Sequence, residues 1–175
     1  PNVILFRKSL PPVVKGVEKT ATILATRRNV PENGYTRFKG HHYGNNVFAR
    51  FELPSLAAQE GIFLTADHFV AEGITSNVFW VKNDTVYTPS LNTGILAGVT
   101  RSLVLALGHQ LGYSVKEGKY DVKELLDAEE CFITNAVQQV VPIRSLDNVT
   151  FLGNDGPVTK EILQAYEQLI QRRLK

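Results

Sequence analysis

One lysine stands apart from the others because of the side chains around it. Lys39 lies in the stretch YTRFKGHHYGNN (residues 35–46), ahead of two histidines, a tyrosine and two asparagines. A lysine amine becomes a nucleophile when burial or neighbouring cations disfavour its charged form, and carbonyl cofactors use such an amine to form Schiff bases. The alternative is an ordinary basic loop that precedes a helix.

Two further stretches carry groups that could bind a cofactor. Glu72 ends the apolar segment HFVAEG, beside a tight glycine turn, where a carboxylate could pair with a buried, positively charged ring nitrogen. In GILAGVTR, Val99 and Thr100 directly precede an expected helix, so their N–H groups and a hydroxyl could bind one anion, helped by the helix dipole. Read alone, each stretch also has a structural explanation: a turn capped by Glu72, and a helix capped by Thr100.

A third stretch could add donors to the same anion. The segment TNA (134–136) ends the apolar run CFIT and could supply further N–H groups. Pyridoxal 5′-phosphate has three groups that a protein can bind: an aldehyde, a ring nitrogen and a phosphate. The lysine, the carboxylate and the expected phosphate-binding N–H groups match these three. The sequence lacks HExxH and any other metal-ligand spacing, both standard nucleotide loops, and GxSxG. It therefore predicts pyridoxal phosphate and no metal.

These groups need a scaffold, for which the sequence predicts mixed strands and helices of the α/β or α+β class. Strands are predicted over 2–6 and 19–28 and in EGIFLTAD, HFVAEG, ECFITNA and VVPIRSLD, with NVFWVKNDTVYT as a hairpin turning at Asn83-Asp84. Helices are predicted over 43–52, 101–112, 121–129 and 157–175, with Gly112 as a stop, Asp121 as an N-cap and Pro157 in a first turn.

Composition limits the classes of function. The 19 basic and 17 acidic residues leave a net charge of +2, too small a bias to indicate nucleic acid. No segment approaches the roughly 18 apolar residues of a membrane span. The single Cys131 cannot form an internal disulfide, which predicts a reducing, cytoplasmic compartment. The chain starts at Pro1 and contains no methionine, so we expect it to be part of a longer polypeptide.

The order and wording of the motifs resemble the class IV (fold-type IV) pyridoxal-phosphate enzymes, the branched-chain and D-amino acid aminotransferases and the 4-amino-4-deoxychorismate lyases. Five motifs cover most of residues 20–165 in the family's order: K-x-x-x-Y-x-x-N from Lys39, AEGITSNVFWV, YTPSLNTGILAGVTR, DAEECFITNAVQQVVPI and GPVTKEI. Within the family, RRNVPENGYTRFKGHHYGNN is most similar to the lyases of Gram-positive bacteria. The aminotransferases usually carry a glycine-rich stretch after the lysine and the tyrosine one residue later, which also favours the lyase.

The resemblance implies a role for each motif. Lys39 would carry the covalent bond to the cofactor, Glu72 would pair with the pyridine nitrogen, and Tyr43 would contact the cofactor. The phosphate would be bound on two sides, by Val99 and Thr100 and by Asn135 and Ala136.

Three arginines complete the implied site. Arg101 follows the phosphate loop and is expected to form a structural ion pair. Arg27 and Arg28 either meet a substrate carboxylate or form a solvated strand end.

The resemblance also implies a fold and an activity. We expect the C-terminal domain of the D-amino acid aminotransferase-like fold, a mixed sheet partly closed into a barrel with flanking helices. Residues 1–15 would end the N-terminal domain and its linker, residues 16–175 would form the cofactor-binding domain, and the upstream domain would be absent. The whole would be a homodimer that turns a small molecule, aminodeoxychorismate, into 4-aminobenzoate and pyruvate for folate synthesis. The alternatives are a class IV aminotransferase and a non-catalytic fragment.

Overall fold

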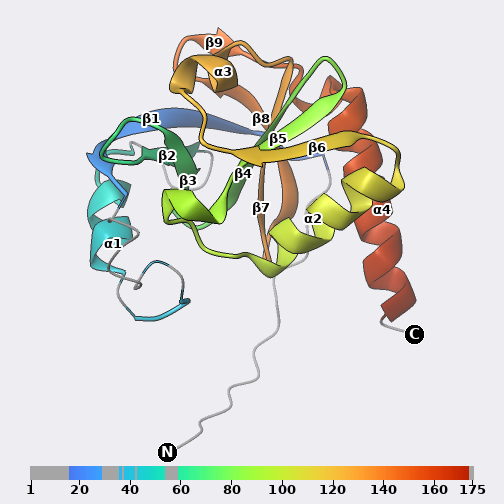
Figure 1. The fold of residues 1–175 in the computed structure, drawn as a ribbon, viewed down its shortest axis with the longest axis horizontal. Coiled ribbons are helices and arrows are strands. Elements are labelled where there is room, and N and C mark those ends of the chain that lie inside the picture. Colours follow the sequence, from blue (N-terminus) through green and yellow to red (C-terminus); the bar gives the residue numbers. More distant parts are fainter. Residues whose placement is uncertain (1–15, 29–35, 37, 42, 54–58, 174–175) are drawn as a thin grey trace, which may run out of the picture.

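The structure is a computed structural model that describes residues 16–28, 36, 38–41, 43–53 and 59–173, so the strand predicted over 2–6 lies outside the described residues. Nine strands of the described part form one mixed sheet in the order β3-β2-β1-β8-β7-β4-β5-β6, with β9 paired to β8. The strands are β1 (Lys19–Arg27), β2 (Gln59–Leu64), β3 (Val70–Gly73), β4 (Asn77–Lys82), β5 (Thr85–Pro89), β6 (Ser114–Gly118), β7 (Glu130–Asn135), β8 (Gln139–Leu146) and β9 (Val149–Thr150). The helices are α1 (Gly44–Arg50), α2 (Val99–Gln110), α3 (Val122–Leu126) and α4 (Pro157–Arg173), with short 3-10 turns at Leu91–Thr93 and Gly153–Asp155 (Figure 1).

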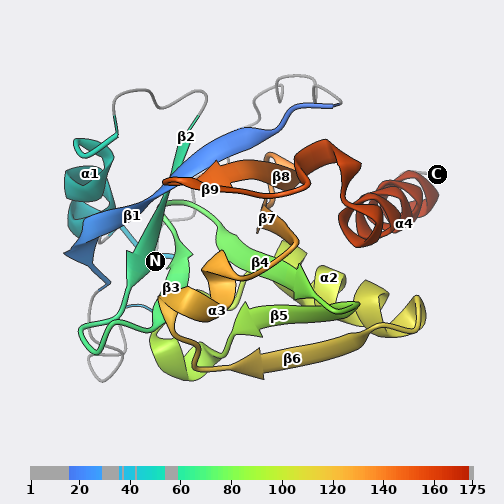
Figure 2. The same ribbon diagram turned by 90° about the horizontal axis from the view of Figure 1, so that it is seen from above.

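The sheet curls until its two ends meet. Strand β1 runs parallel to both β2 and β8, and β5 runs parallel to β6, whereas the other neighbours are antiparallel. Val70 at the start of β3 donates its N–H to the Tyr120 carbonyl, 2.9 Å away and just beyond β6, which joins the two ends of the strand order. Figure 2 shows the resulting half-barrel from above, with α3 over its opening. The mixed, partly closed sheet with flanking helices confirms the predicted fold class.

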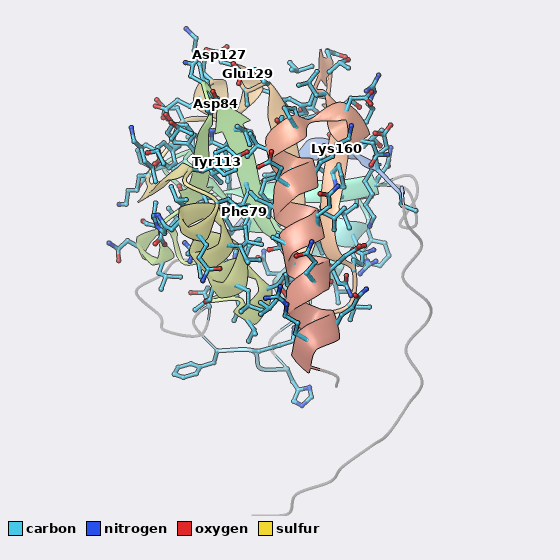
Figure 3. All side chains as sticks on the ribbon, turned by 90° about the vertical axis from the view of Figure 1, so that its right-hand side faces the viewer. Phe79, Asp84, Tyr113, Asp127, Glu129 and Lys160 are labelled. Atoms are coloured by element: carbon cyan, nitrogen blue, oxygen red, sulfur yellow. The ribbon has the colours of Figure 1, made fainter. Side chains whose placement is uncertain are left out.

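Strand β4 shows how the core is divided. Successive side chains of a strand point to opposite faces, and here both faces are buried. Val78 and Trp80 join the cluster inside the curl, whereas Phe79 and Val81 join a second cluster under α2 and α4. Figure 3 shows these two helices side by side with Phe79 between them. A third, smaller cluster lies between α1 and the strands β1 to β3.

Two predicted turns are confirmed in detail. Asn83 and Asp84 have φ values of 49° and 54°, which is the type I′ geometry of a two-residue hairpin between β4 and β5. Gly112 has a φ of 88°, and two backbone hydrogen bonds of a Schellman motif close the last turn of α2 around it.

Helix boundaries depart from the predictions where tertiary contacts intervene. Helix α2 begins at Val99, and its N-cap is Gly98, so the interpretation of Thr100 as the cap is wrong. Helix α3 ends at Leu126 because the chain then joins the sheet, where the Glu129 N–H donates to β4 at 3.0 Å.

Two smaller features also differ. Asp121 occupies the predicted N-cap position of α3, but its side chain makes no capping hydrogen bond. Strand β6 was not predicted, because it lies at the edge of the sheet and its mostly exposed side chains show no apolar alternation.

Candidate functional site

The stretches that carry the candidate residues meet at one cavity of about 270 Å³. Its walls come from the segment before α1, the turn between β3 and β4, the N-terminus of α2 and the end of β7. The volume lies close to the lower end of small-molecule sites, about 300 Å³. Eight predicted residues line it together: Arg28, Lys39, Tyr43, Glu72, Val99, Thr100, Asn135 and Ala136.

Lys39 lies at the exposed side of this cavity. Its ammonium donates a hydrogen bond of 3.0 Å to the Tyr43 hydroxyl and lies 5.7 Å from the centre of the same ring. Tyr43 is the N-cap residue of α1, so its backbone position is set by the start of that helix. The lysine is exposed in this chain.

Glu72, unlike the exposed Lys39, is buried, and both of its carboxylate oxygens have partners. It is 5% exposed at the end of β3. Oε1 lies 2.7 Å from Nη2 of Arg28, and Oε2 accepts hydrogen bonds from the Leu96 N–H at 2.9 Å and the Asn77 amide at 3.3 Å. A carboxylate offers about four acceptor positions, so one further donor can approach from the cavity.

The charge of Glu72 is set by opposing effects. Burial, the largest, raises the pKa of Glu72 to about 7 because water no longer solvates the charged form. The Arg28 guanidinium, the Leu96 N–H and the Lys39 ammonium act in the other direction. At neutral pH the charged and neutral forms of Glu72 are therefore close in free energy, so the loss of one neighbouring charge would change which form dominates.

The turn between β3 and β4 is held from behind by Glu60, which the sequence reading missed. This carboxylate of β2 is 4% exposed and accepts hydrogen bonds from the Ile74 N–H at 3.1 Å and the Ser76 hydroxyl at 3.0 Å. Burial raises the pKa of Glu60, and the Ser76 hydrogen bond lowers it. The sequence does contain one indication of this role, a glutamate next to the apolar residues of QEGIFL, because charged side chains are almost never fully buried unless they are paired.

The start of α2, Gly98 to Thr100, forms the candidate phosphate site, called the cup below. There is no room for a side chain at Gly98. A Cβ on this residue would lie 2.2 Å from Oδ1 of Asn77. The N–H groups of Val99 and Thr100 belong to the first helical turn, which has no intrahelical acceptors. Because the Val99 side chain is 76% exposed, its contribution to an anion site is its backbone N–H.

The end of β7 adds a second wall beside this cup. Oδ1 of Asn135 accepts the N–H groups of Val137 at 3.0 Å and Gln138 at 2.7 Å, which fixes the turn into β8. The Thr134 hydroxyl is buried and lacks a hydrogen-bond partner within the described part of the chain. Thr134 lines the cavity, so an acceptor bound there could satisfy it.

The three predicted arginines have different surroundings. Arg28 lines the cavity and pairs with Glu72. Arg27 donates to two carbonyl groups of its own strand, at 2.7 and 3.1 Å, and does not line the cavity. Arg101 is buried and pairs with Glu117, which confirms the expected structural ion pair.

Neither a metal site nor a membrane span is found in the described residues. No three His, Cys, Asp or Glu side chains of that part are grouped so that they could hold a metal ion. Its helices include none with the length and apolar character needed to cross a membrane.

Comparison with known proteins places these features in a family. The family model of amino-transferase class IV matches residues 1–146. The chain is 40% identical to the aminodeoxychorismate lyase of Bacillus subtilis over 174 residues, which are 99% of this chain and 59% of that protein. It is 34% identical to the branched-chain-amino-acid aminotransferase of Pseudomonas aeruginosa over 154 residues, 87% of this chain and 50% of that protein.

A solved structure shows the same relation. The branched-chain amino acid aminotransferase of Thermobaculum terrenum in its PLP form matches 91% of this chain and 53% of its own, with a TM-score of 0.81 and 28% identity. The chain thus spans about half the length of the known proteins it matches.

Proposed function

Because the chain belongs to the class IV aminotransferase family, we propose that its cavity binds pyridoxal 5′-phosphate and serves a 4-amino-4-deoxychorismate lyase. The observation that carries the proposal is one cavity lined by an accessible lysine, a buried carboxylate and a helix N-terminus. The 40% identity to the Bacillus subtilis lyase supports the choice of reaction. Folate synthesis, a cytoplasmic location and a homodimer completed by an upstream domain are part of the same proposal.

The groups present fit the cofactor. Val99 and Thr100 line the cavity at the start of α2, where the first-turn N–H groups and the Thr100 hydroxyl can donate to a phosphate. The unpartnered Thr134 hydroxyl lies on the same cavity. Glu72 keeps an acceptor position for a ring N–H.

The chain's own residues divide the chemistry between them. Pyridoxal phosphate, when bound, supplies an aldehyde for covalent attachment of amines and a ring that withdraws electrons. Lys39 would hold the cofactor through its amine, and the same amine, when free, would remove the C4 proton of the substrate as a general base. Glu72 stabilises a proton on the ring nitrogen as a hydrogen-bond acceptor. Loss of the C4 proton and departure of the side chain as enolpyruvate would make the substrate ring aromatic, which drives the formation of 4-aminobenzoate. The enolpyruvate then takes up one proton at its methylene carbon, which balances the proton lost from C4, and becomes pyruvate.

An aminotransferase is the second candidate, because the Pseudomonas aeruginosa relative is 34% identical over most of this chain. Lys39 would then move a proton between the substrate carbon and the cofactor. Incubating the protein with pyridoxal phosphate and aminodeoxychorismate in the absence of any keto acid separates the two. Pyruvate and 4-aminobenzoate in equal amounts support the lyase. Their absence, together with amino-group transfer from a branched-chain or D-amino acid to an added keto acid in a parallel incubation, supports the aminotransferase. A protein that takes up no pyridoxal phosphate would instead be the non-catalytic fragment.

A further inference from the structure

The ion pair between Arg28 and Glu72 indicates a task for the arginine other than substrate binding. We propose that Arg28 is a positioning residue that acts through Glu72, holding this carboxylate in its charged form at the wall of the cavity. The relevance to catalysis rests on the proposed function, in which Glu72 meets the ring nitrogen of the cofactor.

The guanidinium is fixed on several sides. Its Nη2 lies 2.7 Å from Oε1 of Glu72, and the two side chains are only 8% and 6% exposed. The guanidinium carbon lies 5.8 Å from the centre of the Phe63 ring in β2. The Arg28 backbone N–H donates to the Leu64 carbonyl at 2.8 Å, which ties the end of β1 to the same strand. The one ion pair of the Arg28 side chain is thus made to Glu72, and its Nε is buried without a hydrogen-bond partner within the described residues.

The carboxylate needs such a partner because its site disfavours charge. Burial is the largest influence on Glu72 and favours its neutral form. The charged groups that act on it are Arg28, from the end of β1, and Lys39, from the segment before α1. The remaining contacts, the Leu96 N–H and the Asn77 amide of β4, are neutral donors.

Lys39 cannot replace Arg28 in this task. A lysine that forms a covalent bond to the cofactor no longer carries a free ammonium group, whereas a guanidinium stays charged throughout. A neutral Glu72 would have no negative charge with which to stabilise a protonated ring nitrogen. Arg28 thus provides the permanent positive charge of this site.

The test is a pH titration of the protein without any cofactor. In a chain labelled with ¹³C at the glutamate carboxyl carbons, the Glu72 signal is assigned by its loss in Glu72→Gln, and its midpoint is followed by NMR. Arg28→Gln should raise this midpoint by roughly one to three pH units, and Arg28→Lys by less, because an opposite charge nearby lowers a carboxyl pKa by that amount. Lys160→Gln is the matched control, since it removes one positive charge from the far surface of α4 (Figure 3) and should leave the midpoint unchanged.

An unchanged midpoint in Arg28→Gln would overturn the proposal. If that variant does not fold, the unmodified chain still decides, because the side-chain ¹⁵N signals of Arg28 should titrate with the same midpoint as Glu72, and independent behaviour would refute the pairing. In the loaded protein, ring-¹⁵N pyridoxal phosphate should lose its protonated signature in Arg28→Gln. A chain that binds no pyridoxal phosphate would refute the proposed function, yet the carboxyl titration would still decide the role of Arg28.

Discussion

The cup at the start of α2 gives the sharpest prediction, Gly98→Ala. The added Cβ would lie 2.2 Å from Oδ1 of Asn77, far inside the contact distance of two such atoms. Backbone strain is not involved, because the φ of −66° and ψ of 138° at this position suit alanine. The Asn77 amide has to move, although it donates to the Leu96 carbonyl at 2.9 Å and to Glu72 at 3.3 Å.

The size of the effect follows from those two contacts. Each hydrogen bond contributes about 0.5–1.5 kcal/mol net, so losing both costs about 1–3 kcal/mol. Because these contacts hold Asn77, we expect part of the clash to be relieved at the Gly98 backbone, which would displace the adjoining N–H groups of Val99 and Thr100. Pyridoxal phosphate affinity should then fall by roughly tenfold to a hundredfold, 1.4 kcal/mol being a factor of ten. An absorbance titration with the cofactor measures the affinity, and a thermal melt of the free protein measures the stability.

Gly44→Ala is the matched control for this substitution. Gly44 begins α1, and a Cβ there would meet nothing within 4 Å, so neither affinity nor melting temperature should fall. If Gly98→Ala bound the cofactor like the unmodified chain and melted at the same temperature, the cup would not be the phosphate site.

Substitutions at three further positions test other parts of the structure. Lys39→Ala should abolish the covalent pyridoxyl adduct that borohydride reduction leaves on the protein, and Lys39→Arg should fail equally because guanidinium stays protonated; an adduct of normal yield, seen by intact mass, would refute the assignment. Glu72→Gln should keep most cofactor binding but lose roughly tenfold to a hundredfold in turnover, since one charge-assisted hydrogen bond is lost. Burial raises the pKa of Glu72 to about 7, so its contribution to stability is full below its unfolded pKa and is lost as pH rises towards 7. Glu72→Gln should therefore weaken the fall of the unfolding free energy with pH over this range. Glu130, 2% exposed, accepts two first-turn N–H groups of α4 and a threonine hydroxyl, so Glu130→Ala should cost about 2–4 kcal/mol and lower the melting temperature by about 5–15 °C. The neighbouring Glu129 accepts one exposed hydrogen bond, from the Asn83 N–H, so Glu129→Ala should lower the melting temperature by much less.

Local chemistry made parts of this structure predictable. Positive φ values at Asn83 and Asp84 follow from residue types that tolerate them, and Gly112 stops α2 for the same reason. The motif residues were also predictable as a set, because the sequence contains the complementary groups that one cofactor needs. Their convergence on one cavity is what the fold adds.

Buried polar residues were harder to predict, because their partners come from other elements. From the sequence, Arg28 is equally compatible with a solvated strand end and with a substrate-binding residue. Only the placement of β3 beside it shows that its partner is Glu72. The partners of Glu60 likewise become known only once the turn after β3 is placed against β2. In both cases the sequence shows a charge in an apolar setting but not the group that compensates it.

The two sides of the cavity are built differently, and this suggests how binding and reactivity are divided. On one side Glu72 is fixed by an arginine, a backbone N–H and an amide, and the cup beside it is shaped by the same Asn77. On the other side Lys39 is exposed and contacts a tyrosine at the start of a short helix. Preorganised donors and acceptors favour affinity, whereas a nucleophile that must release and recapture the cofactor needs freedom to move. The fixed side should therefore account for most of the cofactor's non-covalent affinity, and Lys39 for the covalent step.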